Sequence, residues 1–361
     1  MKKSEPPSAC DDETQSVVCS KEIYNTLEDI SEVIPIEDME SLEEVSRKFN
    51  VRIPNHYLSL IDLNNLENDP IYKQCMPSVE ELEFSPVESA DPLGEESMSP
   101  VSCLVHRYPD RVLLLVTGTC FMYCRHCTRK RLWEKGSCPT EDGELEKAFD
   151  YIRSTSSIRE VVVSGGDPLT LSNSKIDWIL SRLSEMDHIE VIRIGTRAPV
   201  VYPNRITESL CRILEKYEKL WVNVQFNHPS EIVEESILAC KELQRCGIPV
   251  SNQSVLLRGI NDDPEVMKEL CQKLQSIRIR VYYLFQCDPV IGAHHFRTSV
   301  LKGIEILEYM RGHTSGMCIP TFVVDGVEGH GKVPVSPNYL LSMSEKGVLL
   351  RNYENKVFFY E

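Results

Sequence analysis

The alternation of short apolar runs with amphipathic stretches between residues 111 and 311 constrains the fold of this chain most. Six apolar runs have the length and composition of buried strands, and each is followed by a stretch with helical periodicity. The predicted strands are 111–118, 159–166, 189–196, 220–227, 248–257 and 280–287, and the predicted helices lie near 141–155, 173–186, 204–217, 230–246, 263–275 and 298–311. This order indicates a parallel sheet covered by helices.

Residues whose side chains can take part in binding or catalysis follow most of these predicted strands. They are Cys120, Ser164–Asp167, Arg197, Gln225–His228 and Asp288. In a barrel the carboxyl ends of parallel strands converge on one mouth, whereas in an open doubly wound sheet they spread along an edge. The pattern therefore favours an α/β fold whose sheet forms a barrel, full or partial, over an open doubly wound sheet.

The flanking segments differ in composition from the repeating part. The predicted organisation is a disordered acidic tail (1–20), a helical region ending in an irregular connection from about 66 (21–105), the barrel (106–312), and a C-terminal segment (313–361). Within the last segment we expect a strand at 321–325, a glycine-rich loop and a pair of strands near 347–360.

Composition limits the partners. The net charge of −16 argues against a nucleic-acid backbone or an anionic membrane as the main partner. The sequence has no apolar run of about 18 residues and no apolar segment after its first two lysines, so we expect neither a membrane span nor a secretory signal. The cytoplasm is the expected compartment, where the 14 cysteines are thiols or metal ligands rather than disulfides.

Three cysteines are bunched directly after the first predicted barrel strand. Cys120, Cys124 and Cys127 have the spacing C-x3-C-x2-C. A tetrahedral zinc site needs a fourth ligand, and no second pair of ligands is obvious. Three thiolates on a four-iron cluster would instead leave one iron open to an exogenous chelator. The spacing therefore fits one soft metal ion or one face of an iron–sulfur cube.

The segment CFMYCRHC resembles the cluster motif of radical S-adenosylmethionine (SAM) enzymes. This resemblance implies a partial (β/α)6 TIM-like barrel, which agrees with the six strand–helix units predicted above. More of the sequence, from about residue 38 to the end, resembles one branch of that superfamily, the lysine 2,3-aminomutases. The fold implied is then this barrel with an N-terminal helical extension and a C-terminal segment that binds pyridoxal 5′-phosphate. The segments that carry this resemblance are HRYPDRVLLLVTGTCFMYCRHCTRKR, SGGDPLTL, RIGTRAPVVYPNRIT, FNHPSEI, NQSVLLRGIND and GHTSGMCIPTFVVD.

The resemblance implies three cofactors and a set of residues for each. Cys120, Cys124 and Cys127 would hold the 4Fe-4S cluster, and its open iron would be chelated by SAM. Ser164, Gly165, Gly166, Asp167 and Gln253 would bind SAM; the glycines would let a ligand approach the backbone, and Asp167 could accept hydrogen bonds from an ammonium group. Pyridoxal 5′-phosphate (PLP) would be bound by Lys332, the catalytic residue that forms its Schiff base, and by Arg107, Tyr108 and Arg111.

The resemblance also implies a substrate with charges at both ends. Arg129 would bind the α-carboxylate, and Asp288 with Asp325 would bind the distal ammonium of lysine. Two carboxylates in a dry pocket are costly unless a cation joins them, which favours a cationic side chain. Taken alone, each aspartate would more simply be a cap or turn residue, and Lys332 a solvated loop lysine.

The activity implied is an isomerisation in which the 2-amino group of L-lysine moves to C3 to give L-β-lysine, through a PLP imine and a 5′-deoxyadenosyl radical. The resemblance further implies a flavodoxin- or ferredoxin-type electron donor and leaves the oligomeric state, including a homo-oligomer, open. Three alternatives remain: a protein-bound lysine as substrate, arginine as substrate, or a non-catalytic iron–sulfur binding module. Gln225, Glu328 and His330 depart from the family pattern, which usually has histidine at the first position and a more uniform glycine loop around the other two.

Overall fold

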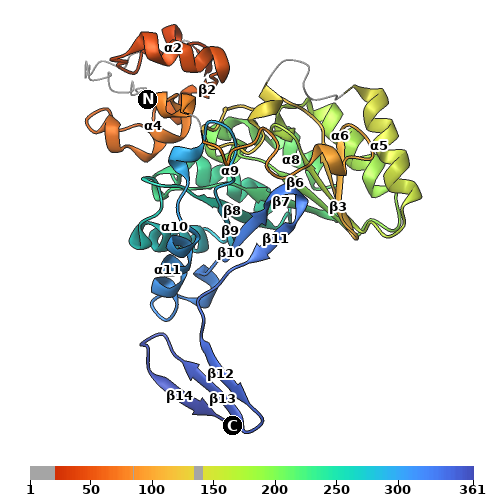
Figure 1. Cartoon of the computed structure of the whole chain (residues 1–361). Helices are drawn as coiled ribbons and strands as arrows, with labels where there is room; N and C mark the ends of the chain where they lie inside the picture. The colour runs from red at the N-terminus through yellow and green to blue at the C-terminus, as the bar shows by residue number, and fades with distance from the viewer. Residues whose placement is uncertain (1–20, 84, 134–140) are drawn as a thin grey trace, which may run out of the picture.

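The computed structural model describes residues 21–83, 85–133 and 141–361, and Figure 1 shows a curved sheet with helices on its outer side. The predicted tail at 1–20 lies outside the described residues. Seven neighbouring strands of the sheet are parallel. They are β4 (Arg111–Leu115), β5 (Glu160–Ser164), β6 (Val191–Gly195), β7 (Leu220–Val224), β8 (Val250–Leu256), β9 (Arg280–Gln286) and β10 (Thr321–Gly326). The predicted partial barrel is confirmed.

Six helices alternate with these strands, as the periodicity predicted. They are α5 (Asp142–Ser154), α6 (Asn173–Ser184), α8 (Glu208–Leu214), α9 (Glu234–Arg245), α10 (Pro264–Ser276) and α11 (Val300–Met310). Each buries one face; in α5 the buried side chains follow the i, i+3, i+4, i+7 pattern, as Leu145, Ala148, Phe149 and Ile152. Four of the helices begin at a capping residue whose side-chain oxygen accepts a hydrogen bond from a backbone N–H of the first turn. The capping residues are Ser172, Thr207, Asp263 and Ser299. A short additional helix, α7 (Ala198–Val201), follows β6.

Two antiparallel strands, which the sequence analysis did not predict, form the edges of the sheet. β3 (Leu104–Tyr108) pairs with β4, and β11 (Gly331–Pro334) pairs with β10. A hydrogen bond joins these two edges: the backbone N–H of Lys332 on β11 donates to the side-chain Oη of Tyr108 on β3 at 2.8 Å. Lys332 therefore lies on a strand at the seam of the barrel and not in a loose loop.

The N-terminal region packs against the cysteine-bearing segment. Its elements are β1 (Ile23–Tyr24), α1 (Leu27–Ser31), α2 (Met39–Lys48), β2 (Ile53–Pro54), α3 (Asn55–Leu58) and α4 (Pro70–Cys75). Arg125, which lies between the second and third clustered cysteines, is fully buried and donates to both carboxylate oxygens of Glu81 and to the backbone oxygen of Asn50. The expectation of an irregular connection from about residue 66 was wrong in part, because this stretch contains the helix α4 and several 3₁₀ turns.

Short 3₁₀ turns lie between these helices and strands. They are Leu66–Asn68, Val79–Leu82, Glu96–Met98, Lys130–Trp133, Pro168–Thr170, Pro203–Arg205, Pro229–Glu231, His294–Phe296, Gly316–Cys318 and Val327–Gly329. The C-terminal strands β12 (Leu340–Ser344), β13 (Gly347–Arg351) and β14 (Val357–Tyr360) form a separate sheet that stands away from the barrel in Figure 1. The terminal pair was predicted, whereas β12 was not. The boundaries between domains remain a prediction. In the described part of the chain, every helix is too short or too polar to cross a membrane.

Candidate active site

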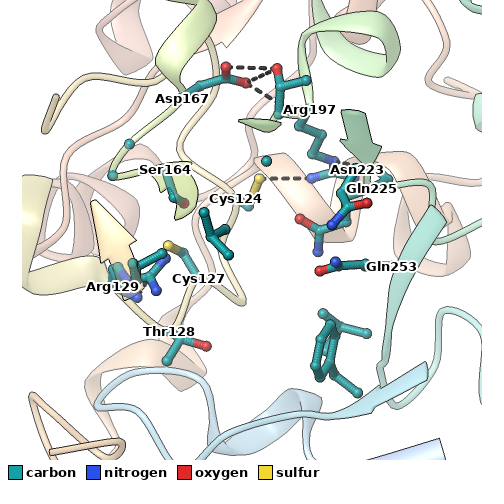
Figure 2. Close-up of a pocket in the computed structure, with 18 of the residues that line it drawn as sticks. Cys124, Cys127, Thr128, Arg129, Ser164, Asp167, Arg197, Asn223, Gln225 and Gln253 are labelled. Carbon is teal, nitrogen blue, oxygen red and sulfur yellow. Dashed lines mark hydrogen bonds between the residues drawn. The ribbon is translucent and has the colours of Figure 1, made fainter. Parts of the chain in front are cut away.

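A single cavity of about 550 Å³ brings together all of the site residues predicted from the sequence. It extends from the carboxyl ends of the parallel strands into the barrel. The predicted residues that line it are Arg107, Tyr108, Arg111, Cys120, Cys124, Cys127, Arg129, Ser164, Gly165, Gly166, Asp167, Gln253, Asp288, Asp325 and Lys332. Figure 2 shows Ser164, Cys124 and Cys127 on one side of it and Gln225 and Gln253 on the other. The convergence that favoured a barrel is therefore found.

The three clustered cysteines approach one another on the loop after β4. Burial raises the pKa of the Cys120 thiol, and the nearby thiols of Cys127 and Cys124 raise it further. Burial, then Cys124, raises the pKa of Cys127 to about 11. Cys120 and Cys127 therefore keep their protons until a cation replaces them, as a metal centre does.

The three thiols are the kind of donors that a four-iron cube takes from a protein. Among the described residues, no three His, Cys, Asp or Glu side chains are arranged to hold one metal ion. Three sulfurs bound to one zinc ion at about 2.3 Å would have to lie within about 4 Å of one another. In a four-iron cube each thiolate binds a different iron, so the sulfurs lie further apart. The donor set thus fits the cube.

The glycine loop after β5 lies against the cysteine loop. A Cβ on Gly165 would come within 2.2 Å of the backbone oxygen of Thr117, and one on Gly166 within 2.2 Å of that of Thr119. The backbone N–H of Gly166 also donates to Thr117 at 2.6 Å. These glycines are therefore required by the contact between the two loops, and their role in binding SAM stays a prediction.

The carboxylate of Asp167 already has protein partners. It accepts hydrogen bonds from the Thr196 hydroxyl at 2.7 Å, from the backbone N–H of Arg197 at 2.8 Å and from that of Leu169 at 3.0 Å. Burial raises its pKa, and these hydrogen bonds oppose that shift. Direct contact between Asp167 and the amino group of SAM stays a prediction, since the geometry alone gives this carboxylate the role of tying β5 to β6.

The opposite part of the cavity is built at the seam of the barrel. The Lys332 amino group lies 3.0 Å from Asp325, and Arg107 Nη1 lies 3.6 Å from the same carboxylate. The Nε atom of Arg107 is buried and has no hydrogen-bond partner among the described residues. The guanidinium of Arg111 stacks over the Tyr108 ring at 4.1 Å. A buried, unpaired guanidinium donor beside a lysine fits the phosphate of PLP.

Asp288 and Asp325 differ in their surroundings although both line the cavity. Burial, followed by repulsion from Asp325, raises the pKa of Asp288 to about 6, against the opposing hydrogen bond from Thr128 at 2.7 Å. Asp325 instead has Lys332 and Arg107 as counter-ions. An additional cation in the cavity would therefore stabilise the charged form of Asp288 more than that of Asp325.

Arg129 is held by a glutamate that the sequence analysis missed. Its Nε and Nη2 atoms donate to the carboxylate of Glu95 at 3.0 and 2.7 Å, and Arg131 Nη2 donates to the same group at 2.7 Å. Although burial alone would raise it, the pKa of Glu95 falls to about 2 because of these two arginines. Arg129 Nη1 makes no hydrogen bond to the described residues, so it remains available to a substrate carboxylate. No sequence motif marks Glu95, because its contact spans 34 residues.

Gln225 occupies the place where the family usually has histidine. Its Nε2 atom lies 3.4 Å from Nε2 of His126, which is itself 3.3 Å from Asn227 Nδ2. Burial lowers the pKa of His126 far below its usual range, and the cations Arg197 and Lys130 lower it further. The side chains on this wall, with Gln253 beside them, are therefore neutral polar groups suited to a neutral ring such as adenine.

The barrel and the cysteine loop together define a radical SAM protein, and the radical SAM superfamily model matches residues 114–271. A second family model, described as lysine-2,3-aminomutase, matches residues 307–361. The first match contains the three clustered cysteines and the loop after β5, and the second contains Asp325 and Lys332.

Full-length relatives specify the family. The L-lysine 2,3-aminomutase of Clostridium subterminale is 50% identical, over 93% of this chain and 81% of its own. The L-lysine 2,3-aminomutase of Methanococcus maripaludis is 52% identical, over 86% of this chain and 72% of its own. A glutamate 2,3-aminomutase of Clostridioides difficile is 45% identical, over 91% of this chain and 78% of its own. The chain belongs to the lysine 2,3-aminomutase family, whose members use a 4Fe-4S cluster, SAM and PLP.

Proposed function

We propose that this protein is an isomerase that converts L-lysine into L-β-lysine. The observation that carries the proposal is the arrangement of charges in one cavity. Arg129 offers a cationic anchor, Lys332 lies at the seam, and the acidic pair Asp288 and Asp325 lines the same space. An amino acid with a carboxylate at one end and an ammonium at the other matches these charges.

The cofactors would be held by residues from opposite parts of the cavity. Cys120, Cys124 and Cys127 would bind the cluster. Ser164 and the loop that follows it, with Gln253 on the facing wall, would bind SAM. When bound, the reduced cluster and SAM supply a 5′-deoxyadenosyl radical, and PLP supplies the carbonyl that carries the migrating amino group. The protein positions these groups and excludes water from them.

Lys332 would bind PLP covalently, with Arg107, Arg111 and Tyr108 around it. The hydrogen bond from the Lys332 backbone to Tyr108 fixes the strand that presents the lysine. The ion pair between Lys332 and Asp325 keeps the amine in the cavity before PLP arrives. Asp325, together with Asp288, would accept the distal ammonium of the substrate.

The substrate carboxylate would bind Arg129 at the atom that Glu95 leaves open. Glu95 occupies the Nε and Nη2 edge, and this fixes the guanidinium before the substrate enters. The acidic pair would reject glutamate, because a third carboxylate there would repel the other two. Overall identity does not decide this point, since the relatives include enzymes named for lysine and for glutamate.

The remaining partners follow from the same proposal. A one-electron donor of the flavodoxin or ferredoxin type would reduce the cluster, and the cytoplasm would be the compartment. A homo-oligomer is supported by the C-terminal sheet, whose exposed apolar side chains include Met343, Val357 and Phe359. Sedimentation of the purified protein tests the last of these points.

An anaerobic assay with SAM, PLP and dithionite over a panel of amino acids tests the function. We expect L-lysine to be isomerised and L-arginine and L-glutamate to react far more slowly. The variant Lys332→Ala should abolish turnover, whereas Lys346→Ala, in a turn of the C-terminal sheet, should not. Turnover of a lysine within a protein but not of the free amino acid would refute the free-substrate proposal. Protein that takes up no iron and sulfide would refute catalysis altogether.

A further inference from the structure

Arg197 follows β6 and lines the cavity, but no step above uses its side chain. We propose that Arg197 is a positioning residue that holds a permanent positive charge against the Cys124 thiolate and thereby raises the reduction potential of the cluster. This inference rests on the proposed function in one respect, since it requires a cluster at the three cysteines.

The contact is direct and buried. Arg197 Nη1 donates to Cys124 Sγ at 2.8 Å, and Figure 2 shows this hydrogen bond at the edge of the cavity. Only 7% of the arginine side chain is exposed. Among the described residues, no other guanidinium donates to a sulfur of the three cysteines; Cys127 accepts only from the backbone N–H of Arg129, at 3.4 Å.

The rest of the guanidinium is fixed by three side chains. Arg197 Nη2 donates to Glu231 at 2.5 Å, to Gln74 at 2.7 Å and to Tyr57 Oη at 3.1 Å. Tyr57 also donates to Glu231, and Gln74 comes from α4 in the N-terminal region. The N-terminal region thus keeps the arginine in place, so that the charge cannot swing away from the sulfur.

The physical effect has a definite sign. An arginine stays protonated in a protein, and a hydrogen bond to a thiolate withdraws electron density from the cluster. Reduction adds a negative charge, which a nearby cation stabilises, most strongly where water is excluded. The fully buried carboxylate of Glu231 opposes this effect from the far side of the guanidinium. Removal of Arg197 should therefore lower the potential, and neutralisation of Glu231 should raise it.

The two functions of Arg197 can be separated. Its backbone N–H holds Asp167 at 2.8 Å, and this hydrogen bond survives any change of side chain. A variant of the side chain alters the sulfur contact and leaves the loop after β5 tied to β6. A purely structural role would change iron content or stability, but it would not give potential shifts of opposite sign in two variants.

The test compares Arg197→Gln and Glu231→Gln with the parent protein. Each is reconstituted anaerobically, iron and sulfide are counted, and the cluster is titrated with dithionite while its absorbance and electron paramagnetic resonance signal are followed. We expect the equilibrium constant for reduction to fall at least tenfold in Arg197→Gln, which corresponds to about 59 mV for one electron. In Glu231→Gln we expect it to rise. Arg205→Gln is the matched control, because Arg205 donates to Leu169, Leu171 and Asn173 and touches no sulfur.

The iron count separates the two levels of the argument. A parent protein without iron would refute the proposed cluster, and with it the proposed function. A fully loaded Arg197→Gln protein with an unchanged potential would overturn only the inference about Arg197, as would shifts of the same sign in both variants. If Arg197→Gln takes up no iron, Glu231→Gln decides alone, and a potential that does not rise overturns the inference.

Discussion

The strongest quantitative prediction concerns Asp288, which carries an unfavourable charge in the ligand-free protein. Its pKa rises from the usual 3.8 to about 6 through burial and the nearby Asp325. The folded protein therefore binds a proton more tightly than the unfolded chain does, and stability falls as pH rises from about 4 to about 6. Above that window the cost of the charge is constant. The variant Asp288→Asn removes the cost.

The magnitude follows from the pKa. Each step of one in pKa corresponds to about 1.4 kcal/mol, so ionisation of Asp288 costs about 3 kcal/mol before screening by water in the open cavity, and about 1–2 kcal/mol after it. A chain of 361 residues has an unfolding entropy of about 0.8 kcal/mol/K. Asp288→Asn should then raise the Tm of the ligand-free protein by about 1–3 °C at pH 8 and leave it unchanged near pH 4.

Thermal unfolding of ligand-free protein across this pH range is the assay, and Asp325→Asn is the matched control. Asp325 has Lys332 and Arg107 as counter-ions, so its neutralisation should lower the Tm at pH 8, opposite in sign to Asp288→Asn. Both variants should bind lysine more weakly. A Tm gain for Asp288→Asn that is the same at pH 4 and pH 8, or a gain for Asp325→Asn, would refute the reasoning.

Three other predictions follow from individual contacts. Glu95→Gln should raise the KM for lysine about tenfold, which corresponds to about 1.4 kcal/mol, with a smaller change in kcat, because Arg129 loses the carboxylate that fixes its guanidinium. Glu96→Gln is the control in the same steady-state assay and should have little effect, since the Glu96 side chain is 77% exposed. Cys127→Ser should bind much less iron after anaerobic reconstitution, since a serine oxygen is a poor ligand for the cluster, whereas Cys246→Ser, outside the cavity, should bind as much as the parent protein. Lys332→Ala should retain no PLP through gel filtration, as read from the visible absorbance, and retention equal to that of Lys346→Ala would contradict the role of Lys332.

Local sequence patterns determined the main elements of the barrel. A period of 3.6 in the helices and continuous apolar runs in the strands follow from which faces are buried, and burial on both faces of a parallel strand leaves a plain record in the sequence. The cysteine spacing is equally local, because Cys120, Cys124 and Cys127 all lie on the one loop after β4. These features needed no knowledge of distant contacts.

The edges of the sheet were less predictable for a physical reason. β3 and β11 are short, pair antiparallel to their neighbours, and are partly exposed, so neither has a continuous apolar run. Their pairing depends on partners that only the closed fold supplies. For the same reason the sequence does not reveal that the backbone of the neighbouring loop excludes side chains at Gly165 and Gly166.

The chain by itself thus determined its barrel, its cluster motif and those cavity residues that belong to a family motif, since each is written in spacing or in resemblance. Only the tertiary structure decided which charges meet. Glu95 reaches Arg129 across 34 residues, and Arg197 reaches Cys124 across 73. Whether two side chains at such separations touch depends on the packing of the whole barrel, because electrostatic interactions are set by distance and burial and not by position along the chain.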